Sequence, residues 1–275
     1  MRFGPLNWEI IVPFKTWKLT LGDNPNGIRY ELNWHDTKRP VFSEGRPALS
    51  TAVAPNGGFG DRVGYEGFGV IEGWVEVSGE RFELSPVTFN GSRDHHWGVR
   101  RGVGGIGAPM FHPEHCGQWV EFKDWSIWGS KNMRPLGHES PGAGRFTTTD
   151  RQLKFDPDTG EFREGVIVNV DEEGETKELH FRRLGFQSAY LRCGGYGPST
   201  PDGGGIHGVY PGEDKLYGGS FNLKDASERD KLGNIVDHHC EVSCGTETTH
   251  GILECFEPEL KKMCEKNHPG FRFLT

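Results

Sequence analysis

Apolar and polar residues alternate along much of this chain, with the period of two that is typical of β-strands. In residues 7–22 the alternating apolar positions are Trp8, Ile10 and Val12, followed after Pro13 by Trp17, Leu19 and Leu21. A turn rich in Asn, Gly and Pro comes next. Residues 28–36 then place Ile28, Tyr30, Leu32 and Trp34 on one face of the following strand. These segments predict hairpins with one polar and one apolar face.

The same pattern continues to the end of the chain. Residues 69–85 predict a hairpin that turns at Ser78 and Gly79, and residues 118–129 predict one strand with aromatic side chains on both faces. Two more hairpins are predicted in residues 155–162 and 166–181, where an Asp-Thr-Gly segment and a Glu-Gly pair mark the turns. Further strands are predicted around residues 216–223, 238–245 and 249–256, and residues 258–270 predict a short helix.

Composition supports an all-β protein. The 275 residues include 41 glycines and 17 prolines, many of them in two long loops at residues 43–64 and 193–214. A chain of this length accommodates one large barrel or two packed β units. Six cysteines are too few for a disulfide scaffold, so reduced thiols are expected.

Charge and hydropathy exclude several classes of partner. The net charge is -8 and the basic residues form no run, which argues against nucleic acid as a partner. No segment is apolar over the length that a membrane span needs, and the first residues lack the pattern of a secretory signal. The expectation is a cytoplasmic protein with no membrane span.

The segment SRDHHWGVR, residues 92–100, concentrates candidate chemistry. In a strand, Asp94 and His96 point to one face while His95 and Trp97 point to the other. A histidine beside a tryptophan pairs an acid–base group with a ring that can hold a cation. The structural alternative is that His95 and Trp97 are packing residues and that Arg93 forms a local ion pair.

Asp124 is the candidate acid. If residues 118–129 form one strand, Val120, Phe122 and Asp124 share a face, and a carboxyl group on an apolar face tends to keep its proton at neutral pH. Such a group can donate a proton. The alternative is that the strand twists or bulges and leaves Asp124 in water.

The motif in residues 92–100, the hairpin before it and the segment QWVEFKDWSIW after it resemble the carotenoid 1,2-hydratase and kievitone hydratase group of lipocalin-like proteins. The resemblance implies two lipocalin-like antiparallel β-barrel units, residues 1–91 and 92–275. Relatives usually carry more strands before residues 7–22. The first unit is therefore either reduced or completed by a partner chain, in a homo-oligomer or a complex, that covers its open edge.

The resemblance also implies a site. The family's functional His, Trp, Tyr and Asp fall on His95, Trp97, Phe122 and Asp124, with Phe122 where the family has Tyr. The second histidine, His96, stands where many relatives have Ser. Asp124, assisted by His95, would protonate a carbon–carbon double bond, and Trp97 would stabilise the cation. The expected substrate contacts are Phe122, Trp119, His96, His207 and Tyr210.

The implied function is cofactor-independent chemistry on a hydrophobic terpenoid, polyketide or aromatic molecule. A hydratase or another lyase, an isomerase and a cyclase all remain open. The alternative is a carrier that binds an apolar ligand without chemistry. The cysteine and histidine spacings match no zinc motif, and no nucleotide-binding loop is present, so neither a metal nor a cofactor is predicted.

Overall fold

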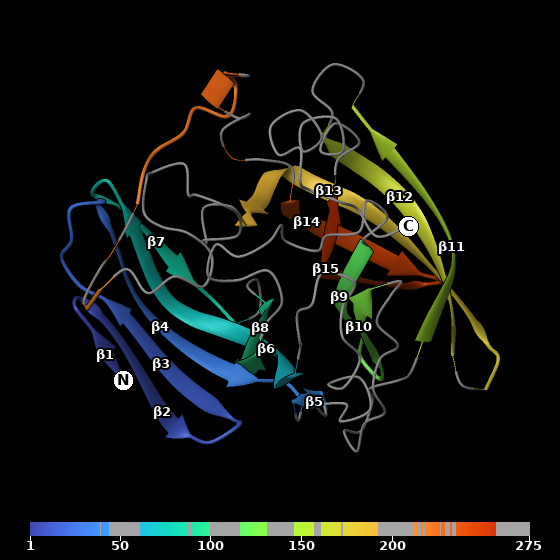
Figure 1. Ribbon diagram of the computed structural model, residues 1–275, viewed down its shortest axis with the longest axis horizontal. Helices are drawn as coiled ribbons and strands as arrows, with labels where there is room; N and C mark the ends of the chain where they lie inside the picture. Colours follow the sequence, from blue (N-terminus) through green and yellow to red (C-terminus); the bar gives the residue numbers. More distant parts are fainter. Residues whose placement is uncertain are drawn as a thin grey trace.

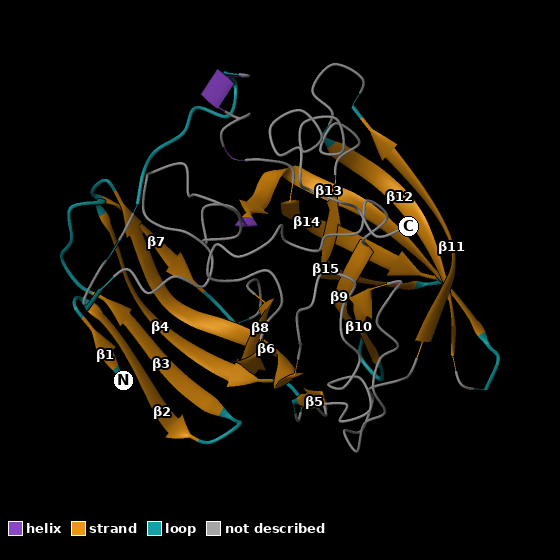
Figure 2. Ribbon diagram, viewed as in Figure 1, coloured by secondary structure: helices purple, strands orange, loops and turns teal. Residues whose placement is uncertain are grey.

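The computed structural model describes residues 1–38, 40–43, 61–86, 90–99, 116–130, 146–156, 161–171, 173–191, 212–213, 216, 218–225, 227–228, 232 and 235–256. These residues form two antiparallel β-sheets that lie side by side (Figures 1 and 2). The predicted all-β architecture with two antiparallel units is therefore confirmed. The helix predicted in residues 258–270 lies outside the described part of the chain.

The first sheet, sheet A, has eight strands in the order β1-β2-β3-β4-β6-β5, with β7 and β8 also paired to the long strand β6. The strands are β1 (Arg2–Phe3), β2 (Leu6–Val12), β3 (Thr16–Leu21), β4 (Ile28–Asp36), β5 (Val41–Ser43), β6 (Asp61–Val77), β7 (Glu80–Leu84) and β8 (Asn90–Val99). Sheet A thus contains residues 92–99, which the sequence interpretation had placed in the second unit.

Sheet A has the apolar and polar faces that the alternation predicts. Trp17 and Trp34 lie directly opposite each other on β3 and β4, and both are buried. On the other face, Lys18 on β3 forms an ion pair with Glu31 on β4 at 2.6 Å. The predicted turn between β6 and β7 is also present. Both of its central residues, Ser78 and Gly79, have positive φ angles of 52° and 87°, the conformation that a two-residue hairpin turn favours.

The second sheet, sheet B, has seven strands in the order β10-β9-β15-β14-β13-β12-β11 and curls into a half-barrel (Figure 1). The strands are β9 (Cys116–Glu121), β10 (Ser126–Ser130), β11 (Phe146–Phe155), β12 (Phe162–Asp171), β13 (Thr176–Tyr190), β14 (Ile235–Cys244) and β15 (Glu247–Phe256). The predicted hairpins in residues 155–162 and 166–181 correspond to β11–β12 and β12–β13.

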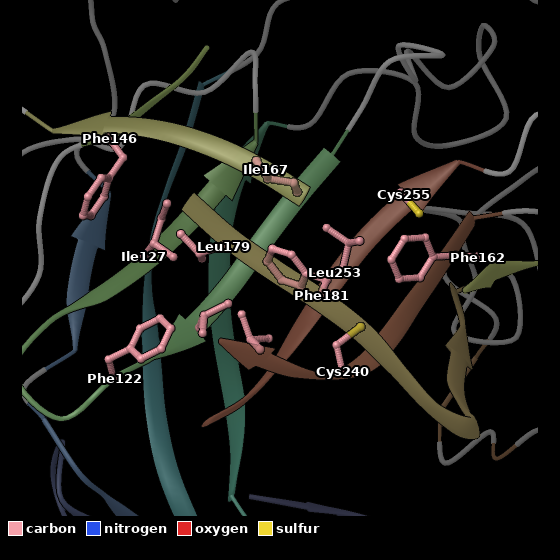
Figure 3. Close-up of a cluster of buried hydrophobic side chains, with 12 residues drawn as sticks. Phe122, Ile127, Phe146, Phe162, Ile167, Leu179, Phe181, Cys240, Leu253 and Cys255 are labelled. Atoms are coloured by element: carbon pink, nitrogen blue, oxygen red, sulfur yellow. The ribbon is translucent and has the colours of Figure 1, made fainter. Parts of the chain in front are cut away.

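The main core of the protein lies inside sheet B. Figure 3 shows Phe122 and Phe146 at one end of this core and Phe162 at the other. Buried polar side chains connect the two margins of the curled sheet, because Gln118 on β9 hydrogen-bonds with Asn169 on β12 at 3.0 and 3.1 Å. These two strands are not neighbours in the sheet, so this contact crosses the interior.

The expectation of one continuous strand in residues 118–129 was wrong. β9 and β10 form a tight hairpin in which the Phe122 amide donates to the Trp125 carbonyl at 2.8 Å. Lys123 and Asp124 occupy its turn and are exposed. Hydrophobic periodicity missed the turn because Phe122 and Trp125, on either side of it, stack on each other with ring centroids 4.3 Å apart.

The two sheets are joined by polar contacts at the end of β4. Lys38 Nζ donates to the carbonyls of Phe122 and Trp125, at 2.8 and 3.3 Å, and so caps the β9–β10 turn. Thr37 Oγ1 donates to Glu121 Oε2 at 2.6 Å. Sheet A is thereby fixed against the outer face of β9. None of the described residues belongs to a helix long and apolar enough to cross a membrane.

Candidate site in the cleft between the two sheets

The strand that carries the SRDHHWG motif separates its side chains between two environments. On β8, Arg93 and His95 face the aromatic side of sheet A, where His95 lies against Tyr65 with ring centroids 5.5 Å apart. Ser92 lines a cleft that faces sheet B, and Asp94 acts electrostatically on Asp237 of β14. Alternate side chains of the motif therefore face either the aromatic side of sheet A or the cleft, as expected for a strand.

Arg93 is a structural clamp on the aromatic side. Its guanidinium binds Asp36 through two hydrogen bonds of 3.0 and 2.7 Å, and it lies over the rings of Trp17 and Tyr65 at 4.7 and 4.9 Å. Trp34 Nε1 donates to the same carboxylate at 2.7 Å. The Asp36 side chain is only 2% exposed, so this buried pair joins β4 to β8 across β6.

A cleft of about 540 Å³ separates the two sheets. This volume is in the range of sites that hold small organic molecules. The apolar residues that line it are Phe68, Trp119, Leu184 and Ile252, and the polar ones include Asn90, Ser92, Glu121, His239 and His250. The mixture of aromatic and polar side chains fits a ligand with an apolar body and a few hydrogen-bonding groups.

Strand register explains how these side chains come together. On sheet B, Trp119, Ile252 and His239 are direct partners across β9, β15 and β14 and form one row of the wall. The next row along the strands contains Glu254 and Asp237, which are also direct partners. Two residues along a strand span about 6.8 Å, so the two rows are neighbours.

Sheet A also has a row of residues that lines the cleft, followed along the strands by a row with carboxyl groups. Phe68 on β6 and Ser92 on β8 are direct partners that line the cleft, and the next row contains Glu66 and Asp94. The rows with carboxyl groups therefore approach each other at one end of the cleft. The influence of Asp94 on Asp237 shows that they are close enough to interact.

Asp237 holds a proton at neutral pH. Burial is the main cause that raises its pKa to about 8, and the charge of Glu254, a hydrogen bond with Glu254 and the charge of Asp94 add to it. A carboxyl group that keeps its proton at neutral pH is a source of general acid. Within the described residues, Asp237 Oδ1 is buried and makes no hydrogen bond.

His239 supplies the complementary group. It lies two residues from Asp237 on the same face of β14, and desolvation lowers its pKa. The imidazole is therefore neutral at neutral pH and can accept a proton. A protonated carboxyl group beside a neutral histidine is a typical arrangement for acid–base chemistry, because the two environments move the pKa values in opposite directions.

A second polar cluster lies inside sheet B. His238 is 1% exposed, Ser188 Oγ is 3.0 Å from its Nδ1, and its ring lies against Phe162. Burial, together with Arg183 and His239, lowers its pKa to about 3. Arg183 in turn pairs with the buried Glu161 at 3.2 Å.

The predicted catalytic residues are not assembled as expected. His95 is exposed and packs on Tyr65 of sheet A, whereas Asp124 is exposed in a turn of sheet B. The premise that Asp124 lies on an apolar strand face was wrong, because the chain turns at this residue. Trp97 and His96 lie in β8, but their side chains are outside the described part of the protein.

The predicted substrate contacts also lie in different parts of the protein. Trp119 lines the cleft. Phe122 is 3% exposed and belongs to the core of sheet B. His207 and Tyr210 lie outside the described residues.

Sequence reasoning missed the carboxyl row and the histidines of the cleft. The signal was present in the strand pattern, because Asp237 and His239 alternate with buried residues on β14, as Glu254 does on β15. The same alternation is found in any strand with one face in water. Only the position of sheet A turns this face into the wall of a cleft. Among the described residues, no group of three or more His, Cys, Asp or Glu side chains could hold a metal ion.

No curated protein and no solved structure matches this chain. A family of unknown function (DUF8625) matches residues 1–127, which comprise sheet A, β9 and the turn that follows it. The chain is therefore similar to this family over the sheet that carries the SRDHHWG motif and over the strand that closes the cleft.

Proposed function

We propose that this protein is a cofactor-independent acid–base enzyme that acts on an unsaturated, partly apolar small molecule bound in the cleft between the sheets. The observation that carries the proposal is the partly buried Asp237–Glu254 carboxyl pair, which lies one strand row from the cleft wall and next to the neutral His239. In this proposal Asp237 takes the role of acid that the family resemblance implied for Asp124.

The proposed chemistry uses the protonated carboxyl group of Asp237 and the neutral imidazole of His239. The carboxyl pair donates its proton to one carbon of a double bond, and His239 accepts a proton from the water that attacks the other carbon, so that one molecule of water is added. If His239 instead removes a proton from the substrate, the double bond moves and the mass is unchanged. A positioned acid or base contributes about 10² to 10⁴-fold to such a step.

The cleft supports binding as well as proton transfer. Phe68 and Trp119 come from opposite walls, so an apolar body can lie between an aromatic side chain of each sheet. Ser92 and Asn90 add hydrogen-bonding groups beside them on β8. Sites between packed units commonly hold small ligands in this way.

The test is product analysis with Asp237→Asn. Wild type and variant are incubated with a panel of terpenoid and phenolic alkenes, and products are sought by mass spectrometry at the mass of added water or as isomers separated by chromatography. We expect turnover by wild type and at least a 100-fold loss in a folded Asp237→Asn. Asp150→Asn, which changes an exposed aspartate on β11, is the matched control.

Two outcomes contradict the proposal. Full activity in Asp237→Asn combined with loss in Asp124→Asn would restore the assignment implied by the family resemblance. Ligands that bind to wild type and are recovered unchanged would show that the cleft belongs to a carrier.

A further inference from the structure

Two cysteines lie opposite each other on neighbouring strands of sheet B. Cys116, the first residue of β9, and Cys255, the last but one residue of β15, are direct partners in the antiparallel register. Cys255 is a thiol in the core of sheet B and is 1% exposed (Figure 3). Because direct partners share a face of a sheet, the register places both cysteines on the same face.

The β9–β10 hairpin shows which kind of strand pair they form. Each residue of a central strand directs its backbone N–H and C=O groups toward one neighbouring strand, and successive residues alternate between the two neighbours. The Phe122 amide is directed across the β9–β10 turn, since it donates to the Trp125 carbonyl at 2.8 Å. Cys116 is an even number of positions from Phe122, and the register has no shift between them, so its backbone groups also point toward β10 and away from β15.

The β14–β15 hairpin gives the same result from the other strand. A two-residue turn joins Cys244 to Glu247, which are direct partners and therefore form the hydrogen-bonded pair that closes such a hairpin. Cys255 is an even number of positions from Glu247, so its backbone groups point toward β14 and away from β9. Cys116 and Cys255 are thus a non-hydrogen-bonded pair, the kind in which Cα atoms lie about 4.5 Å apart and side chains are closest.

This pair geometry fits a disulfide bond. Cysteines joined by a disulfide have Cα atoms about 4.4–6.8 Å apart and Cβ atoms about 3.5–4.5 Å apart. Direct cross-strand partners have Cβ atoms about 4.5–5.5 Å apart, with non-hydrogen-bonded pairs at the short end of that range. The bond requires the strands to approach slightly, and the strain that this introduces makes a disulfide easier to reduce.

The other two cysteines of the described strands lack such a partner. The register sets Cys240 opposite Gly251 on β15 and Arg183 on β13, and it sets Cys244 opposite Glu247. Within the described strands, only the pair at the ends of β9 and β15 therefore has the geometry of a disulfide.

We infer that Cys116 and Cys255 form a reversible cross-strand disulfide with a small-molecule disulfide, such as oxidised glutathione, as the oxidant. One protein thiolate attacks the oxidant and releases one molecule of reduced glutathione. The second thiolate attacks the mixed disulfide and releases another, so that two protein thiols and one oxidised glutathione become one protein disulfide and two reduced glutathiones. Because Cys255 is buried, the exchange begins when the ends of the two strands open, which is where local opening costs least.

The bond restrains one wall of the cleft. Trp119 on β9 and Ile252 on β15 are direct partners that line this wall, and the disulfide joins the same two strands. It also closes a long loop of the unfolded chain, which stabilises the folded protein. The inference goes beyond the proposed function and does not depend on the acid–base chemistry.

The test is peptide mapping of the full chain after equilibration with glutathione. The protein is incubated in an excess of oxidised or of reduced glutathione, remaining thiols are blocked with N-ethylmaleimide, and proteolytic peptides are identified by mass spectrometry. We expect a peptide pair linked through Cys116 and Cys255 in the oxidised monomer and its loss in reduced glutathione. Thermal unfolding of the oxidised protein should occur at a higher temperature than that of the reduced protein.

Cys244→Ser is the matched control, because Cys244 lies opposite Glu247 and not opposite a cysteine. It should keep both the link and the shift in unfolding temperature, whereas Cys116→Ser and Cys255→Ala should abolish them. Circular dichroism shows whether each variant is folded, and Cys116→Ser keeps the test decisive if Cys255→Ala is not.

Several results would overturn the inference. These are the absence of the linked pair in folded wild type with excess oxidised glutathione, a link that forms only between two chains, and a link that persists in excess reduced glutathione. An unchanged temperature shift in a folded Cys116→Ser would also overturn it.

Discussion

At the scale of single residues, the buried Asp36 carboxylate of sheet A is held in place by several donors. It is held by two bonds from Arg93 and one from Trp34, and Arg93 is itself enclosed by two aromatic rings. The arginine of the motif therefore has a structural role, in contrast with its neighbours on the opposite face of β8. A buried pair of this kind contributes strongly only while both partners are present.

We expect Asp36→Ala to lower the free energy of unfolding by about 3–5 kcal/mol, because it leaves the Arg93 guanidinium buried without a carboxylate. Urea denaturation checks this value. Lys18→Met, which breaks an exposed ion pair on the other face of the sheet, should cost less than about 1 kcal/mol. Equal effects of the two substitutions would show that the buried Asp36–Arg93 pair stabilises the protein no more than an exposed ion pair does.

Asp237 gives a second prediction at this scale, and its sign follows from its pKa. The folded protein keeps the Asp237 proton up to about pH 8, whereas the unfolded chain loses it near pH 3.8. Stability is therefore lost as the pH rises through this interval. Asp237→Asn should be more stable than wild type at pH 8, by up to about 5 kcal/mol for a shift of about four pKa units, and should differ little at pH 4.

Denaturation of both proteins at several pH values measures the difference. The same variant is the one expected to lose activity, so a gain in stability with a loss of turnover would separate a catalytic role from a structural one. A variant that is less stable at pH 8 would show that the carboxyl pair serves to hold the sheets together.

At the scale of elements, β14 shows how one strand serves two environments. Asp237 and His239 face the cleft, and His238 between them faces the interior of sheet B. Burial disfavours the charged form of the side chain on both faces. Burial raises the pKa of Asp237 and lowers the pKa of His238, to about 8 and about 3.

The buried histidine makes the fold sensitive to acid. The folded-state pKa of His238, about 3, lies below the ordinary value of 6.5, so the unfolded chain takes up a proton first as the pH falls. The stability due to the neutral imidazole is complete above about pH 6.5 and decreases towards pH 3. Between pH 6.5 and pH 5 the loss should reach about 2 kcal/mol.

His238→Gln tests this prediction, because it keeps a hydrogen-bonding side chain beside Ser188 and removes the titrating group. The slope of unfolding free energy against pH should become flatter between pH 5 and pH 6.5. His180→Gln, at an exposed position on β13, is the matched control. An unaltered slope in His238→Gln would mean that other groups cause the acid sensitivity.

At the scale of the whole molecule, the cleft exists because two sheets are held side by side. Lys38 and Thr37 follow the last strand residue of β4 and contact the β9–β10 hairpin. This contact links sheet A to the strand of sheet B that forms one wall of the cleft. The hydrogen bonds from a charged group to two backbone carbonyls are of the stronger kind.

Lys38→Met should weaken this link by about 1.5–3 kcal/mol. Hydrogen exchange is the measurement of choice, because the Phe122 amide, which closes the turn, should exchange faster while amides in β12 and β13 do not change. Lys154→Met, on the exposed side of β11, is the control. Faster exchange throughout sheet B would show that Lys38 supports the core rather than the contact between the sheets.

The sequence by itself determined the local elements of this protein. Alternation of apolar residues predicted β2, β3, β4 and the hairpin of β6 with β7, and the pairs Ser78–Gly79 and Glu173–Gly174 predicted hairpin turns, because these signals depend on residues close together in the chain. The β9–β10 turn escaped detection because aromatic residues flank it on both sides.

Only the tertiary structure decided which polar strand positions form a site. Asp94, Asp237 and Glu254 come from two sheets, and each looks like an ordinary solvent-facing residue in its own strand. The environment that raises the pKa of Asp237 arises from burial, from Glu254 on the neighbouring strand and from Asp94, which lies more than 140 residues away in the chain. Periodicity records the face on which a side chain lies, whereas the chemistry depends on what the opposite sheet places against that face.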